Sequence, residues 1–215
     1  MAVEMWQYPA WLAQHRAAFS RHPEAALIPY VRALNCVALD ELNTSGPNLL
    51  FDEAEQALES VISSDGATPT RLHHLVMVLI NDAQANAFSG GPNWPDQGRA
   101  LDAAVSAVTW QRHLRAHLDA AGQRAPIEAV EMVRSSTVNA HLTLARVQAA
   151  CALMDDAHAS YASAVDSVTT PSLEDEWRDL VTSVGLELGV DYGSHVGAAS
   201  EDLRTRCWYW YGPVA

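Results

Sequence analysis

The amino-acid sequence predicts an all-α protein made of stacked antiparallel helical hairpins, arranged either as an irregular α-solenoid or as a compact bundle. Apolar residues recur at alternating steps of three and four along most of the chain, which is the spacing of one helical face. Alanine is the dominant apolar residue and aromatic residues make up only 7%, which suits closely packed helices better than a pleated sheet. A chain of 215 residues can bury a core without disulfides, so we expect one domain over residues 1–215.

Proline and glycine signals divide the first half of the chain into helices. Pro29 either begins the second helix or kinks it, because proline cannot donate a backbone hydrogen bond. Thr68 is predicted to cap the fourth helix, and Trp94 to cover a core edge from a long loop. In chain order, the predicted helices of this half span residues 9–21, 24–42, 51–63, 69–88 and 97–121.

The longest predicted helix runs from Pro126 to Met154, and we expect it to be the central element of the fold. Its apolar residues form two adjacent stripes, so other helices should cover it on more than one side. Ser135, Ser136 and Thr137 mark a place where it could bend. One stripe comprises Val130, Val133, Thr137, Ala140, Leu144, Val147, Cys151 and Met154, and the other comprises Val138, Leu142, Ala145, Ala149 and Leu153.

Two shorter helices follow the long one. Asp155 and Asp156 are predicted to form a turn or an N-cap that leads into a helix over about residues 157–165. Pro171 opens the last helix, which should end near residue 188 because Gly189 follows there. These two helices complete the expected series of hairpins.

The C-terminal tail differs in composition from the rest of the chain. Residues 189–200 are rich in Gly, Ser and Ala, which is typical of a flexible stretch. The chain then closes on CWYWYGPVA, where Trp208 and Trp210 alternate with tyrosines at a strand-like period. We expect this aromatic tail to dock in extended form against the helices, with both tryptophans buried.

One predicted hairpin carries the pattern of a helical repeat. Leu144 and Ala145 form a large and small pair, and Ala157, Tyr161 and Ala164 follow at the spacing of a second helix. This segment resembles a tetratricopeptide repeat, although His141, Gln148 and Thr169 replace the usual Trp, Tyr and Pro. Looser matches elsewhere follow no regular period, and together the matches cover about a third of the chain. The resemblance implies stacked hairpins with a concave surface for a protein or peptide.

The composition limits the classes of partner and chemistry. A net charge of −13 argues against nucleic acid or an anionic membrane as the partner, because both bind basic surfaces. Every basic residue is arginine, and the absence of lysine excludes Schiff-base chemistry and a P-loop lysine. Three cysteines without C-x-x-C spacing predict reduced thiols in a cytoplasmic protein. The chain contains no run of eighteen apolar residues, so no membrane span is predicted.

Two acidic clusters are the candidate partner-binding residues. Both belong to predicted helices, where they would form charged faces that complement a basic protein. The simpler alternative is that these acids only keep the protein soluble. The first cluster is Asp52, Glu53, Glu55 and Glu59, and the second is Glu174, Asp175, Glu176 and Asp179.

His113 and His117 are candidate metal ligands. They are four residues apart, so they share one face of a predicted helix, as in many metal-binding helices. His73, His141 or Glu131 could complete such a site. However, the chain has no H-E-x-x-H motif and no Glu-x-x-His pair of the di-iron kind, so solvent-exposed histidines are the alternative interpretation. A metal is the one cofactor that this pattern would suggest.

The leading functional expectation is a non-enzymatic, cytoplasmic protein that binds another protein. A bacterial immunity protein that neutralises a basic toxin is one concrete version, motivated by size, charge and fold class. The first alternative is a helical enzyme that uses a metal at His113 and His117, or an apolar pocket formed by Trp94, Trp110 and the tail. The second alternative is a structural homodimer, in which part of the long helix's apolar surface faces another copy.

Overall fold

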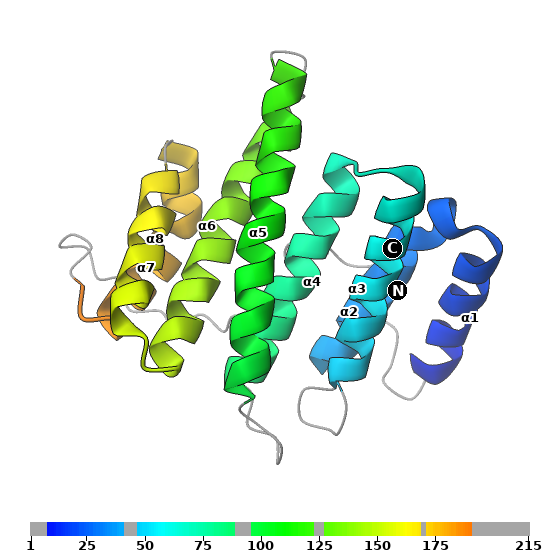
Figure 1. The fold of residues 1–215 in the computed structure, drawn as a ribbon, viewed down its shortest axis with the longest axis horizontal. Helices are drawn as coiled ribbons and strands as arrows, with labels where there is room; N and C mark the ends of the chain where they lie inside the picture. The colour runs from blue at the N-terminus through cyan, green and yellow to red at the C-terminus, as the bar shows by residue number, and fades with distance from the viewer. Residues whose placement is uncertain (1–7, 41–46, 89–95, 123–126, 169–170, 191–215) are drawn as a thin grey trace.

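The computed structural model describes residues 8–40, 47–88, 96–122, 127–168 and 171–190, which fold into eight α-helices and no strand (Figure 1). The all-α prediction is therefore confirmed for this part of the chain. None of these helices combines the length and apolarity that crossing a bilayer requires. They are α1 (Tyr8–Arg21), α2 (Pro23–Asp40), α3 (Pro47–Asp65), α4 (Pro69–Phe88), α5 (Gln97–Ala121), α6 (Ile127–Ala150), α7 (Met154–Ser167) and α8 (Pro171–Glu187).

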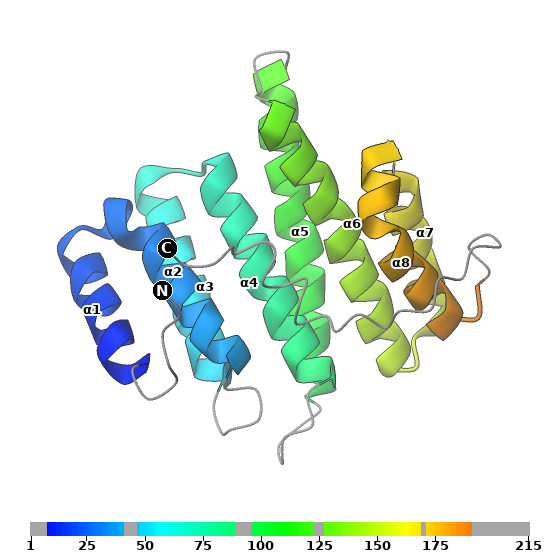
Figure 2. The same cartoon turned by 180° about the vertical axis from the view of Figure 1, so that it is seen from behind.

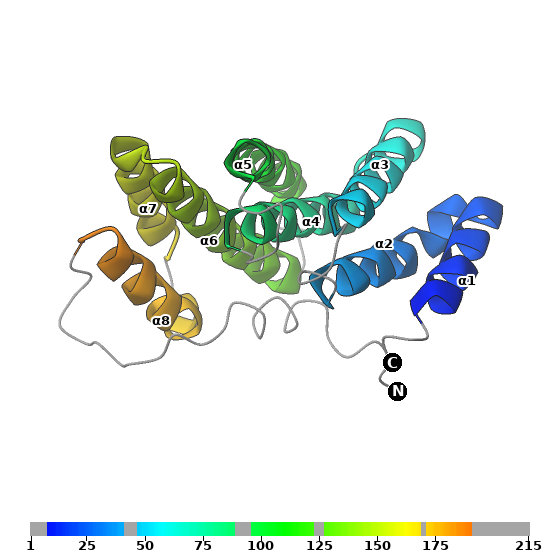
Figure 3. The same ribbon diagram turned by 90° about the horizontal axis from the view of Figure 1, so that it is seen from below.

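The helices form two layers along the long axis of the molecule. Each helix packs against the next one in the chain, so neighbouring elements form successive hairpins. In addition, α2, α4, α6 and α8 contact one another in that order and make one layer, with α3, α5 and α7 on its other side (Figure 3). Figures 1 and 2 show α1 and α8 at opposite ends of this array.

The most enclosed helix is α4. Fourteen of its twenty residues are buried, and it contacts α2, α3, α5 and α6. Asn81 of α4 donates a hydrogen bond of 3.1 Å from Nδ2 to Oδ1 of Asn35 in α2, so a buried polar pair also joins these helices. The long helix, α6, likewise contacts α4, α5, α7 and α8, so it shares with α4 the central position that the sequence predicted for it. Helical periodicity measures how wide an apolar face is, but not where the helix lies in the array.

The long helix is shorter than predicted. It ends at Ala150 because the chain takes a positive φ of 60° at Ala152, and Met154 begins α7 instead of ending α6. The helix also continues without interruption through Ser135 and Thr137, where a bend was conceivable. Thr137 Oγ1 donates to the carbonyl of Val133 at 2.7 Å, a bond back to the preceding turn that helices accommodate.

The two apolar stripes of α6 face two different core clusters. Ala140, Leu144 and Val147 pack with residues of α1 to α5, whereas Val138, Leu142, Ala145 and partly buried Ala149 pack with α7 and α8. The expectation that α6 is covered on more than one side is thus confirmed. Since most residues of both stripes are covered within the chain, the stripes give little support to the homodimer, which stays a prediction.

Most turn signals agree with the observed helix ends. Thr68 Oγ1 accepts a hydrogen bond of 3.3 Å from the backbone N–H of Arg71, as its capping role predicts. The third helix begins at Pro47, four residues earlier than expected, and α2 continues through Pro29. Asp155 and Asp156 lie inside the first turn of α7, because Leu153 occupies the N-cap position. Charge near a helix N-terminus is favourable in either position, so composition alone does not locate the cap.

Packing of α7 and α8 against α6 depends on two aromatic side chains. Trp177 of α8 is buried, and its indole N–H donates to Ser135 Oγ of α6 at 2.9 Å. Tyr161 of α7 is also buried and donates to the carbonyl of Val181 at 3.0 Å. Each ring therefore contributes apolar area while its polar atom keeps a partner.

Two cysteines lie within the described residues. Cys36 and Cys151 are free and half-buried, and Cys151 packs against the main core cluster. Burial raises the pKa of Cys36 to about 11, so its thiol stays protonated at neutral pH. The predictions for Trp94, for Cys207 and for the aromatic tail lie outside the described residues.

Candidate functional site

The acidic residues of α3 are tied to arginines of other helices. Arg16 of α1 donates from Nε to Glu53 at 2.7 Å, and the Tyr30 hydroxyl of α2 donates to the same carboxylate. These contacts lower the pKa of Glu53, chiefly through its hydrogen bond with Arg16. Glu53 thus joins α1, α2 and α3.

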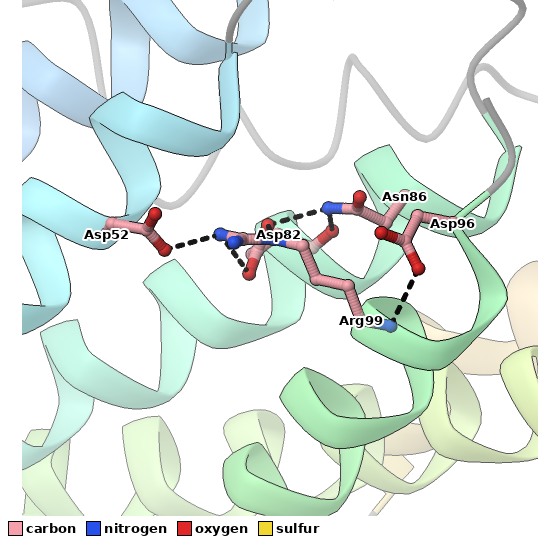
Figure 4. A network of polar contacts seen from close by, with 5 residues as sticks. All are labelled: Asp52, Asp82, Asn86, Asp96 and Arg99. Carbon is pink, nitrogen blue, oxygen red and sulfur yellow. Dashed lines mark hydrogen bonds and ion pairs between the residues drawn. The ribbon is translucent and has the colours of Figure 1, made fainter. Parts of the chain in front are cut away.

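A second arginine joins α3, α4 and α5 (Figure 4). Arg99 of α5 contacts Asp82 of α4 through two atoms, Nε at 3.0 Å and Nη2 at 2.9 Å, and reaches Asp52 of α3 at 2.8 Å. Asn86 donates to Asp82 at 2.7 Å, and Asp96 caps α5 by accepting from the Arg99 backbone N–H. Burial raises the pKa of Asp82 to about 6, although its hydrogen bond with Arg99 acts in the opposite direction.

Two of the four predicted α3 carboxylates, Asp52 and Glu53, are therefore tied to other helices. Asp52, Glu53 and Glu55 are half-buried, and only Glu59 of the four predicted residues is exposed. Burial, followed by the nearby charge of Glu59, raises the pKa of Glu55. A partner would have to compete with Arg16 and Arg99 to reach the first two carboxylates.

The acidic residues of α8 have a different environment. Glu174 and Asp175 contact Arg178 of the same helix at 3.4 and 3.0 Å, and exposed pairs of this kind contribute little to stability. Glu176 accepts a hydrogen bond of 2.9 Å from Ser135, and Asp179 is exposed. These carboxylates remain accessible at the surface.

Helices α7 and α8 together form what we call the acidic end of the molecule. They carry eight acidic residues and one arginine, so their formal charge is −7. All eight acids are exposed: Asp155, Asp156, Asp166, Glu174, Asp175, Glu176, Asp179 and Glu187. The two helices pack together at one end of the array, whereas α3 lies in its other half (Figure 1). The structure therefore does not bring the two predicted acidic clusters together.

His113 and His117 are exposed on α5. The ring of His113 lies 5.4 Å from that of Trp110, at an angle of 52°. Within the described ranges, no group of three His, Cys, Asp or Glu residues is arranged to hold a metal ion. His73 is buried on α4, where burial lowers its pKa to about 3. Metal binding by the α5 pair stays a prediction.

A half-open pocket of about 480 Å³ lies between α5, α6 and α7. Its apolar surface comes from Leu118, Val130 and Val133, and its polar groups from α5, α6 and the end of α7. This volume is within the range of small-molecule sites, roughly 300 to 1,000 Å³. The polar lining residues are Arg115, Asp119, Arg134, Thr137, Asp166 and Ser167.

Sequence reasoning missed both the arginines that organise α3 and the pocket. Arg16 and Glu53 are 37 positions apart, and Arg99 and Asp52 are 47 apart, so no local spacing links them. A weak signal for the arginines was available, because carboxylates that are half-buried beside an apolar stripe need a cation as a partner. The pocket forms only where three helices lie side by side, and residue spacing within one helix does not predict that arrangement.

In comparisons with known proteins, no family model, no curated protein and no solved structure matched this chain.

Proposed function

We propose that this chain is a non-enzymatic binding protein that recognises a basic protein through its acidic end, the exposed carboxylates of α7 and α8. The observation that carries this proposal is the contrast between the acidic residues of α3 and those of the acidic end. Within the described residues, two of the α3 carboxylates are engaged by arginines of other helices, Arg16 and Arg99, whereas only one of the eight exposed acids of the acidic end, Glu187, pairs with an arginine outside α7 and α8, namely Arg146. Such a field accelerates association with a positively charged partner.

The helical array supports the same proposal. Of the five residues that carry the tetratricopeptide resemblance, Ala145, Ala157, Tyr161 and Ala164 are buried together in one core cluster between α6, α7 and α8, whereas Leu144 packs in the main core cluster. The layer formed by α2, α4, α6 and α8 agrees with a repeat-like stack of hairpins. Proteins built in this way offer extended surfaces to other proteins. We therefore keep the tetratricopeptide-like arrangement as part of the proposal.

The concrete version is a cytoplasmic, bacterial immunity protein that binds a basic toxin. A toxin that acts on nucleic acid needs a basic surface, and a dense carboxylate surface would cover it by charge complementarity. The formal charge of −13 would then serve both solubility and recognition.

The test is capture of partners from a cell lysate on the immobilised full chain, followed by binding kinetics with the identified partner. We expect a positively charged partner whose association slows as salt rises. Asp175→Asn with Asp179→Asn should reduce the association rate roughly threefold, because surface charges act mainly on encounter.

The matched control removes two exposed acids from α3, as Glu59→Gln with Asp65→Asn. We expect this control to bind like the unmodified chain. A neutral or acidic partner, an association rate that does not depend on salt, or an equal effect of both double variants would each contradict the proposal.

A further inference from the structure

The pocket between α5, α6 and α7 has a rigid apolar floor. Val133 is 3% exposed and belongs to a small core cluster with Leu72 of α4 and Leu114 of α5. Leu118 packs against this cluster and lines the pocket as well. Because three helices hold the floor, its shape does not depend on a ligand.

The two hydroxyl groups that line the pocket already have partners. Thr137 Oγ1 donates to the Val133 carbonyl and accepts from Gln111 Nε2 of α5. Ser167 Oγ donates to the Ser163 carbonyl at 2.7 Å. Specific recognition in this pocket therefore falls to its charged side chains.

The charged lining is balanced. Arg115 and Asp119 come from α5, Arg134 comes from α6, and Asp166 comes from α7. All four side chains are exposed, and none forms an ion pair with another described residue. Their charged groups are thus available to a ligand, with two cations and two anions above an apolar floor.

We propose that this pocket binds a small apolar zwitterion, a free amino acid or short peptide that has an apolar side chain and two ends that are unmodified and therefore charged. The carboxylate end pairs with Arg115 and Arg134, since guanidinium groups suit carboxylates. The ammonium end pairs with Asp119 and Asp166, and the apolar body covers Val130 and Val133. Asp166 is the only carboxylate that the pocket shares with the acidic end, and the variants that test the two proposals do not overlap, so either proposal can fail without the other.

Isothermal titration calorimetry of the full chain with trileucine tests the site. We expect trileucine to bind, and its amide and its Nα-acetyl derivative each to bind about tenfold more weakly, because each loses one charge-assisted contact. Leucine is the further probe: weaker binding than trileucine assigns the site to peptides, and equal or tighter binding assigns it to free amino acids.

Two double variants connect each end of the ligand to its residues. In Arg115→Gln with Arg134→Gln, trileucine and its amide should bind with equal affinity. In Asp119→Asn with Asp166→Asn, trileucine and its acetyl derivative should bind with equal affinity. These side chains are exposed, so the variants should keep the helical content that circular dichroism measures.

The controls remove the same charges elsewhere, as Arg21→Gln with Arg112→Gln and as Glu59→Gln with Asp65→Asn. Both controls should bind trileucine like the unmodified chain. The proposal is overturned if neither trileucine nor leucine binds, if the three peptides bind with equal affinity, or if a control weakens binding as much as its matched pocket variant.

Discussion

At Arg99, one guanidinium group satisfies carboxylates from two other helices. Asp82 has a side chain that is only 5% exposed, so its charge is tolerable because Arg99 and Asn86 surround it. Asp52, the other partner of Arg99, is 40% exposed and can be solvated without it. The contribution of Arg99 to stability therefore depends mainly on Asp82, and on whether Asp82 is ionised.

Replacing Arg99 with alanine should destabilise the protein by about 3 kcal/mol at pH 7.5, because it leaves a buried carboxylate without its cation. The folded pKa of Asp82, already about 6 against 3.8 in the unfolded chain, should rise further. Folding then favours the protonated form, so stability falls as the pH rises through that pKa, and the loss should be smaller at pH 5. Urea unfolding at pH 7.5 and at pH 5 measures how much free energy of unfolding the variant loses at each pH.

Two further variants separate this mechanism from a general loss of packing. Arg99→Ala with Asp82→Asn should recover part of the lost stability at pH 7.5, because no charge is then buried. Arg178→Ala, whose partners are exposed, should cost less than about 0.5 kcal/mol. An equal cost of Arg99→Ala at both pH values would count against the role given to Asp82.

At the level of elements, α7 and α8 approach each other through a glycine. A Cβ atom at Gly185 would lie 2.5 Å from the Tyr161 hydroxyl and 3.0 Å from the Val190 carbonyl oxygen. Tyr161 cannot move freely, because its hydroxyl donates to the Val181 carbonyl. The glycine is required here by close approach and not by an unusual backbone conformation.

Gly185→Ala should therefore destabilise the protein by about 2 kcal/mol, since overpacking outweighs the gain in helix propensity. Adding Tyr161→Phe removes the nearest atom and should lessen the cost of the alanine. Gly98→Ala is the matched control, because its Cβ would meet only Asp96 at an ordinary 3.6 Å. Thermal unfolding of the three variants and of the unmodified chain gives the comparison, and a neutral Gly185→Ala would show that the two helices separate easily.

At the level of the whole molecule, one buried and two half-buried histidines link stability to pH. Burial lowers the pKa of His73, His74 and His141, which lie on α4 and α6 in the middle of the array. Folded His73 is protonated only near pH 3, whereas an unfolded histidine is protonated near 6.5. Between these pH values His73 takes up a proton when the chain unfolds, so the free energy of unfolding falls as the pH drops.

His73→Gln should flatten this dependence. Each histidine that gains a proton on unfolding contributes a slope of about 1.4 kcal/mol per pH unit. Between pH 6 and pH 4, the free energy of unfolding of the variant should therefore fall less steeply than that of the unmodified chain by about this amount. His113→Gln, at an exposed position, controls for the replacement of a histidine as such. Parallel curves for His73→Gln and the unmodified chain would contradict the prediction.

The sequence by itself determined which segments are helical and which of their faces are apolar. The two stripes of α6 and the cap at Thr68 follow from contacts within a few residues, so spacing along the chain suffices to predict them. The ends of the helices were harder to predict, because the backbone at Ala152 ends α6 without a glycine or a proline as a signal.

Only the tertiary structure decided which acids are engaged, which helix is enclosed and where a pocket forms. Arg16 reaches Glu53 and Arg99 reaches Asp52 across three helices, so identical residue types became structural ties on α3 and an exposed surface on α7 and α8. The physical reason is that helix formation is local, whereas ion pairing and burial depend on the order in which helices pack. That order depends on many weak contacts between alanine-rich faces, which no short pattern in the chain specifies.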